Sequence, residues 1–185
     1  MNPDDAVKKL KEGNARFVAG KPSAKNLVSQ RQSLVSGQKP FAIILTCSDS
    51  RVAPEHIFDA GLGEIFVVRT AGNIADAIAL GSMEYAAEHL GSTLLVVMGH
   101  ESCGAVKAAC MSGHAEGNIG AIVKELQAAV KMGNKEPAKV VEENVKCVLE
   151  AIRKKSGILS NLEKEGKLRI AGAVYSLSPG EVSYF

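Results

Sequence analysis

The fold is decided by the stretch FAIILTCSDSR, residues 41–51. Its first six residues are apolar or β-branched and predict a buried strand, as in a parallel sheet covered on both faces. A thiol, a carboxylate and a guanidinium then follow within a few positions, from Cys47, Asp49 and Arg51. A second apolar run, residues 93–98, ends in GHESCG at 99–104. Two strand ends that each supply a thiol or an imidazole predict one metal site built from both.

Strands and helices alternate along the whole chain. Further strands are expected at 64–70 and 168–175, and helices at 77–90, 103–111, 119–132, 137–155 and 159–165. This alternation predicts an α/β fold with a mainly parallel central sheet flanked by helices. Residues 181–185 are expected to add a C-terminal edge strand. In such sheets, sites form beyond the carboxyl ends of the strands, where Cys47, Arg69 and His100 lie.

Two helices are expected before the first strand, an amphipathic one at 4–18 and a short one at 26–35. Gly20 and Pro22 mark the end of the first helix. The apolar face of this N-terminal helical arm, residues 1–37, needs a partner, either the body of its own domain or another subunit. Because no linker divides the chain, residues 1–185 are expected to form a single domain.

The composition excludes several classes of function. Hydrophobic residues make up 46% of the chain, and the net charge is only +2 with its lysines and arginines dispersed, so no nucleic-acid surface is expected. No apolar run reaches the length of a membrane span, and no signal peptide is visible, so a cytoplasmic location is expected. In such a chain, cysteines favour metal binding or catalysis over disulfides.

Cys47, His100 and Cys103 form a candidate zinc set, because zinc favours thiolate and imidazole ligands. A catalytic zinc site usually keeps three protein ligands and one exchangeable position. The alternative is that both cysteines are buried apolar thiols and that His100 is a helix cap. The two remaining cysteines, Cys110 and Cys147, are expected to be small core residues of helices. That alternative leaves the neighbouring carboxylate and guanidinium unexplained.

Asp49 lies two residues from a candidate ligand. Its carboxylate could accept a hydrogen bond from a metal-bound water, or could take the fourth metal position itself. Arg51 could hold the carboxylate away through a bidentate pair. The site would then be closed with Asp49 on zinc and open with Asp49 on Arg51. The simpler interpretation of this pair is a local salt bridge.

The two motifs at 47–51 and 99–104 strongly resemble those of the β-class carbonic anhydrases. The resemblance extends over nearly the whole chain and includes residues 12–17, 69–73, 82–86 and 172–175. It implies zinc-dependent, reversible hydration of carbon dioxide to bicarbonate and a proton, by zinc-bound hydroxide oriented by Asp49 and Arg51. It also implies one zinc per chain on Cys47, His100 and Cys103, with Asp49 as a ligand only in a closed state.

The same resemblance implies further contacts. Gln38 matches a glutamine that hydrogen-bonds the substrate in some members, and the backbone amide of Gly104 matches another substrate contact. The family implies a homodimer or higher homo-oligomer in which the N-terminal arm embraces the neighbour. Thr70 stands where asparagine is common in the family. Since the chain has no tryptophan, the bicarbonate-inhibition pocket of some members is not expected in its usual form.

Three alternative functions remain open. Relatives on the same scaffold hydrolyse carbon disulfide or carbonyl sulfide with the same ligands. A thiol enzyme could use Cys47 as nucleophile and Arg51 as anion clamp, although a cysteine-phosphatase loop spaces its arginine further away and carries glycines. A non-enzymatic, zinc-stabilised interaction module would have no need of Asp49 and Arg51 beside the metal.

Overall fold

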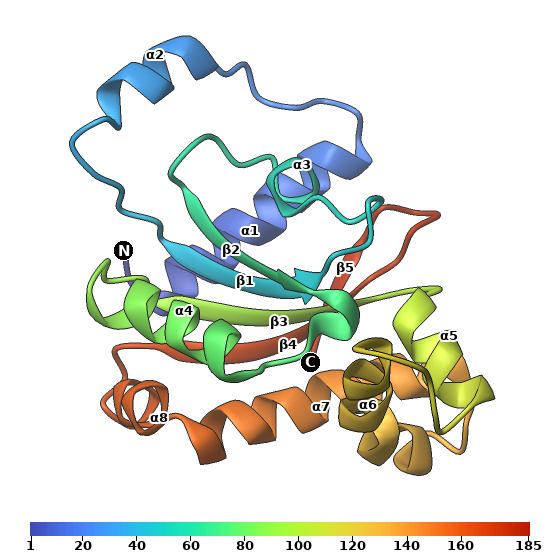
Figure 1. Ribbon diagram of the computed structural model, residues 1–185. Coiled ribbons are helices and arrows are strands. Elements are labelled where there is room, and N and C mark those ends of the chain that lie inside the picture. Colours follow the sequence, from blue (N-terminus) through green and yellow to red (C-terminus); the bar gives the residue numbers. More distant parts are fainter.

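The computed structural model describes residues 1–185 and is built around one five-stranded sheet (Figure 1). Its strands are β1 (Ala42–Cys47), β2 (Ile65–Thr70), β3 (Leu94–His100), β4 (Arg169–Tyr175) and β5 (Val182–Tyr184). They lie side by side in the order β2-β1-β3-β4-β5. The first four strands are parallel, and β5 pairs antiparallel with β4 at one edge. The α/β class, the mainly parallel sheet and the C-terminal edge strand are therefore confirmed.

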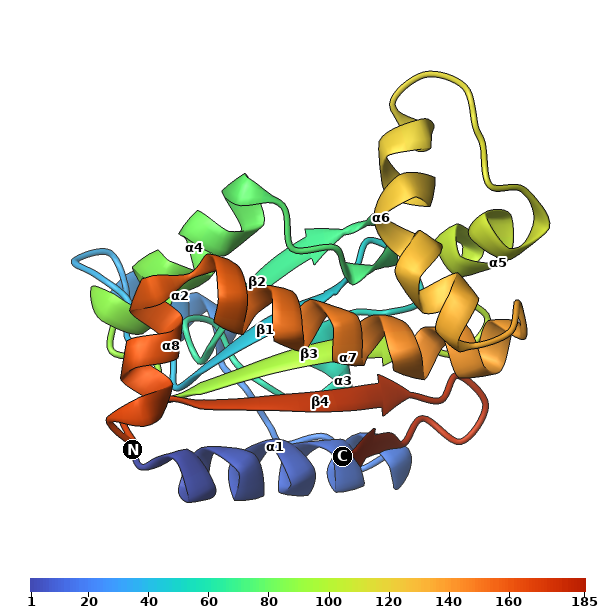
Figure 2. The same ribbon diagram turned by 90° about the horizontal axis from the view of Figure 1, so that it is seen from below.

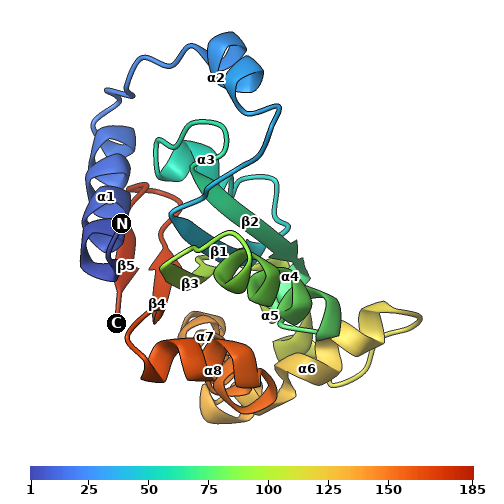
Figure 3. The ribbon, with the colours of Figure 1, turned by 90° about the vertical axis from the view of Figure 1, so that its left-hand side faces the viewer.

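Helices cover both faces of this sheet (Figures 1 and 3). On one face lie α1 (Pro3–Val18) and α3 (Pro54–Ile57), and on the other α4 (Ala77–Glu88), α7 (Pro137–Lys155) and α8 (Gly157–Lys164). Two more, α5 (Gly104–Met111) and α6 (Ile119–Met132), lie past the carboxyl ends of the strands (Figure 2). None of these helices combines the length and the apolar character that a membrane crossing requires.

The predicted strands and helices are all found, each with bounds within two residues of those expected. Two short elements were not predicted as helices. One is α3, a single turn opened by Pro54, and the other is the 3₁₀ turn η1 (Ala71–Asn73) directly after β2. Both lie in connections rich in turn residues, where no hydrophobic periodicity can develop.

The central strands are buried on both faces because their side chains alternate. Along β1, Ile43 and Leu45 belong to the apolar cluster under α4 and α7, while Ile44 belongs to the cluster under α1. Every residue of β1 and β3 is buried. This double coverage explains why the sequence shows continuous apolar runs at these positions.

The first helix of the N-terminal arm packs on the sheet of its own chain. Ala6 and Leu10 are buried in the cluster on that face. The Asn14 side chain donates to the carbonyl oxygens of Ile57 and Gly180, at 3.2 and 2.8 Å. Thus α1 contributes to the core of its own chain.

The second helix of the arm, α2 (Leu27–Ser33), behaves differently. It buries none of its residues and stands away from the sheet at the top of Figure 1. Its contact with the body includes a hydrogen bond from the Leu62 backbone N–H to Gln30 Oε1, at 3.1 Å. Leu27 and Val28 are 51% and 59% exposed, so α2 presents apolar surface to its surroundings.

A backbone contact at Gly13 fixes how α1 crosses the body. A Cβ atom at this position would lie 1.9 Å from the carbonyl oxygen of Phe58, which as a backbone atom cannot swing aside. We therefore expect Gly13→Ala to lower the free energy of unfolding by about 3 kcal/mol. Urea denaturation measures this change. The control is Gly81→Ala in α4, where a Cβ meets nothing within 4 Å and a gain of up to about 1 kcal/mol is expected. Equal changes in the free energy of unfolding for Gly13→Ala and Gly81→Ala would contradict the close approach of Gly13 to Phe58.

Candidate metal centre

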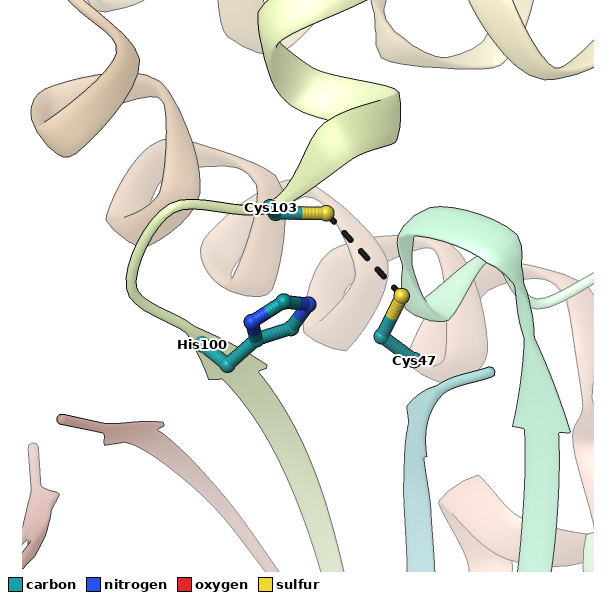
Figure 4. Close-up of side chains that lie close together, drawn as sticks. All are labelled: Cys47, His100 and Cys103. Atoms are coloured by element: carbon teal, nitrogen blue, oxygen red, sulfur yellow. Dashed lines mark hydrogen bonds between the residues drawn. The ribbon is translucent and has the colours of Figure 1, made fainter. Parts of the chain in front are cut away.

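The candidate metal ligands lie at the ends of two neighbouring strands and in the turn that follows one of them. Cys47 is the last residue of β1, and His100 is the last residue of β3. Because β1 and β3 are adjacent and parallel, their carboxyl ends lie at the same edge of the sheet. A tight turn then carries the chain from His100 to Cys103, which precedes the first residue of α5. The structure thus brings together the three predicted ligands (Figure 4).

The spacing of the ligand atoms fits one tetrahedral metal ion. The two sulfurs and an imidazole nitrogen lie within 4.8 Å of one another, and the sulfurs of Cys47 and Cys103 are 4.0 Å apart. Bonds of about 2.3 Å at a tetrahedral zinc place two sulfurs roughly 3.8 Å apart, whereas a disulfide needs about 2.05 Å. All three side chains are buried. The cluster is therefore a possible metal site and not a disulfide.

His100 supplies the observation that tests this fit. Its Nδ1 lies 2.8 Å from the carbonyl oxygen of Glu101, so Nδ1 carries the proton and donates it to that oxygen. The lone pair is then on Nε2, which is buried without a hydrogen-bond partner and faces the two thiols (Figure 4). An unsatisfied buried nitrogen is costly, and a metal bond would satisfy it.

The contact between the two thiols shifts their pKa values in opposite directions. The hydrogen bond from the Cys103 thiol lowers the pKa of Cys47 and outweighs the opposing effect of burial. The backbone N–H of Gly72 also points at the Cys47 sulfur, at 3.4 Å. The same thiol contact, together with burial, raises the pKa of Cys103. A divalent cation would hold both sulfurs as thiolates.

Asp49 faces this cluster and is held by Arg51. The Arg51 Nε and Nη2 atoms donate to the two carboxylate oxygens at 2.9 and 2.7 Å, and the Arg51 backbone N–H donates to Oδ1 at 3.0 Å. These hydrogen bonds hold the pKa of Asp49 well below its usual range. Asp49 Oδ2 also lies 3.9 Å from His100 Nε2. The carboxylate is thus beside the ligand atoms but bonded to Arg51.

Two supporting features were not predicted from the sequence. Arg69 donates from Nε to the carbonyl oxygen of Cys47 and from Nη2 to that of Asp49, at 3.1 and 2.7 Å. Ser102, in the turn between the two ligands on the second motif, has a φ of 57°, which is rare for a residue other than glycine. The sequence did place Arg69 at the carboxyl ends of the strands, where sites form. Its hydrogen bonds could not be predicted, because they depend on the register of β2 against β1.

The two predicted substrate contacts are placed very differently. Gly104 is the first residue of α5, where the backbone N–H has no partner within the helix, and it directly follows the ligand Cys103. Gln38 precedes the amino end of β1, while Cys47 ends that strand. At about 3.3 Å per residue, β1 alone separates them by roughly 16 Å. In its own chain, Gln38 thus lies beyond the opposite end of β1 from the cluster.

Comparison with known proteins agrees with this geometry. A family model described as "Carbonic anhydrase" matches residues 42–182, well over half of the chain. The chain belongs to the β-carbonic anhydrase family. It is accordingly a carbonic anhydrase, a type of lyase. Both segments that carry the candidate ligands lie within the matched residues.

Similar proteins extend over almost the full length. "Carbonic anhydrase 2" of Mycobacterium tuberculosis is 43% identical, over 97% of this chain and 91% of the relative. The carbonic anhydrase of Mycolicibacterium smegmatis is 41% identical, over 98% and 92%. Among solved structures, a β-carbonic anhydrase from Coccomyxa in complex with acetazolamide has a TM-score of 0.76 at 26% identity, covering 85% of this chain and 77% of its own. A tetrameric β-carbonic anhydrase from Sordaria macrospora has a TM-score of 0.77 at 23% identity, covering 84% and 85%.

Proposed function

We propose that this carbonic anhydrase uses one zinc ion per chain, held by Cys47, His100 and Cys103, for the reversible hydration of carbon dioxide to bicarbonate and a proton. The observation that carries this proposal is the unsatisfied His100 Nε2 facing two thiols. Thiolates and imidazole are the donors that zinc prefers, and three of them leave one exchangeable position. When bound, zinc supplies Lewis acidity that makes a water molecule nucleophilic at moderate pH.

Asp49 and Arg51 are proposed to form the catalytic pair. Because its pKa is held low, the Asp49 carboxylate is ionised at every pH at which the enzyme works, so it only accepts hydrogen bonds. In this proposal the carboxylate would accept a hydrogen bond from the water at the exchangeable position and so orient that water toward the substrate. Arg51 keeps the carboxylate out of the exchangeable position. The hydrogen bonds between Arg51 and the Asp49 carboxylate support an open state of the site in this proposal.

The burial of the ligands supports a small substrate. Cys47, His100 and Cys103 are at most 5% exposed, so a bulky substrate could not approach the ion. The N–H of Gly104, at the start of α5, is proposed to donate to an oxygen of carbon dioxide or bicarbonate. Carbonyl sulfide and carbon disulfide are small too, and they remain the alternative substrates for the same ligand set.

The exposed helix α2 of the N-terminal arm supports a proposal about how the chains associate. We expect a homodimer or a larger homo-oligomer in which α2 contacts the neighbouring chain, because its apolar side chains have no cover in their own chain. Such an arrangement would also offer Gln38 to the substrate site of a second chain. A single domain over residues 1–185 and a cytoplasmic location remain predictions from the sequence.

The proposed function is tested by stopped-flow hydration of carbon dioxide from neutral to alkaline pH, on protein of known zinc content. Two thiolates and a neutral imidazole cancel the charge of Zn²⁺, so the water should be less acidic than at an all-histidine site, where its pKa is about 7. Asp49 contributes no change here, because a depressed pKa leaves it ionised throughout this range. We therefore expect activity to rise toward alkaline pH.

Each outcome of this experiment has a definite meaning. Zinc near one per chain with a rising profile supports the proposal, and removal of zinc by a chelator should abolish the activity. A flat profile would contradict the charge argument. Zinc without hydration at any pH would direct the assays to carbonyl sulfide and carbon disulfide, and activity that survives the chelator would favour Cys47 as a nucleophile.

A further inference from the structure

The Arg69 side chain bonds to backbone carbonyl oxygens and not to a carboxylate. Arg69 lies next to the end of β2, and β2 pairs with β1, so its side chain reaches the turn that follows β1. There it donates to the carbonyl oxygens of Cys47 and Asp49. It forms no ion pair with any carboxylate of the chain, whereas the comparable Arg169 on β4 pairs with Asp4. Although Arg69 is exposed, its hydrogen bonds within the chain both go to the backbone of the segment that carries Cys47 and Asp49.

Two arginines thus hold Asp49 from opposite ends. Arg51 binds the carboxylate, and Arg69 binds the backbone carbonyl. The distance of 3.9 Å between Asp49 Oδ2 and His100 Nε2 shows how little the carboxylate would have to move to join the ligand atoms. Arg69 holds the turn that carries this carboxylate at two points.

We propose that Arg69 is a positioning residue for the hydration reaction. By fixing the carbonyl groups of Cys47 and Asp49, it keeps the Asp49 carboxylate on Arg51 and leaves the exchangeable metal position to water. This inference rests on the proposed function, because the exchangeable position matters only if the reaction uses it.

The competing explanation is that the backbone alone holds the turn. The Val52 backbone N–H also donates to the Asp49 carbonyl oxygen, at 2.9 Å, and the Ser48 backbone N–H donates to the Thr70 carbonyl oxygen, at 3.2 Å. If these bonds are sufficient, Arg69 is an ordinary surface residue. Removal of its guanidinium distinguishes the two explanations, because it leaves both backbone bonds in place.

The test compares Arg69→Met, Arg69→Lys and the control Arg169→Met, all in the zinc-loaded enzyme. Zinc content, kcat and KM for carbon dioxide, and a crystal structure of each variant are measured. We expect zinc to remain near one per chain, kcat of Arg69→Met to fall about 10-fold with KM little changed, and its Asp49 carboxylate to lie on the metal. Lysine keeps the charge but has a compact ammonium in place of the planar guanidinium that bridges the two carbonyl oxygens, so Arg69→Lys should be intermediate. Arg169→Met should match the unmodified enzyme.

The inference is overturned if Asp49 stays on Arg51 in the Arg69→Met structure, whatever the change in kcat. It is also overturned if Asp49 moves to the metal but kcat stays within twofold of the unmodified enzyme. If Arg69→Met does not fold, Arg69→Lys decides by the same two criteria. An unmodified enzyme that fails to hydrate carbon dioxide would refute the proposed function, while the position of Asp49 in the variant structures would still test Arg69.

Discussion

Replacement of Asp49 by asparagine is expected to lower the hydration of carbon dioxide by at least about 100-fold while zinc stays bound. The amide has nearly the shape of the carboxylate, but it lacks the charge that pairs with Arg51 and offers a donor where an acceptor is needed. Since Asp49 is not one of the three clustered ligands, the metal should not be lost with it. The effect should therefore fall on kcat.

Metal analysis and stopped-flow assays of Asp49→Asn give the two readouts. Asp4→Asn is the matched control, because the Asp4 side chain is 89% exposed and lies on α1, away from the cluster. Unchanged turnover in Asp49→Asn would remove Asp49 from the mechanism. Loss of zinc along with the activity would instead mean that Asp49 is a metal ligand in the resting enzyme.

Replacement of Cys103 by serine should remove zinc and activity together. Serine is close in size but is a poor zinc ligand, and the loss of one thiolate leaves only two protein ligands. Because even residues that merely support metal ligands contribute 10–100-fold to affinity, we expect zinc affinity to fall by more than about 100-fold. Competition with a chromogenic chelator measures this change.

The chain offers matched cysteine controls for this experiment. Cys110 and Cys147 are half-buried outside the cluster, and the Cys147 thiol contacts the sulfur of Met132 at 3.7 Å. Cys110→Ser and Cys147→Ser should keep zinc near one per chain and keep full activity. A similar loss of zinc in these variants would mean that the metal is not confined to the Cys47, His100 and Cys103 set.

The sequence was sufficient to predict the strands and the clustering of Cys47, His100 and Cys103, for a physical reason. A parallel strand that is covered on both faces must be apolar along its whole length, so the runs at 41–46 and 93–98 stand out. Parallel strands also end at one edge, so Cys47 and His100 could be expected to meet there. Neither inference needs the details of side-chain packing.

Other features depend on packing that no periodicity reveals. The second of these runs was expected to end at Met98, but β3 continues to His100. Gly99, which suggests a turn in the sequence, lies inside the strand. A glycine fits there because a Cβ would lie within about 3 Å of Val141 and Val145 of α7. In the same way, the pattern of α1 showed an apolar face but not which surface covers it. The bonds of Arg69 likewise follow from the register of β2 with β1.

The position of the cluster across β1 and β3 ties metal content to the folded state. Cys47 and Cys103 are 56 positions apart, and they meet only when these two core strands are paired. An unfolded chain keeps only His100 and Cys103 close together, so it should bind zinc much more weakly than the folded chain. Zinc should therefore stabilise the native chain by mass action. Free zinc at about 1,000 times the dissociation constant would add about 4 kcal/mol. Zinc release would then report global unfolding of the sheet. A shortage of zinc would shorten the lifetime of the protein as well as abolish its activity.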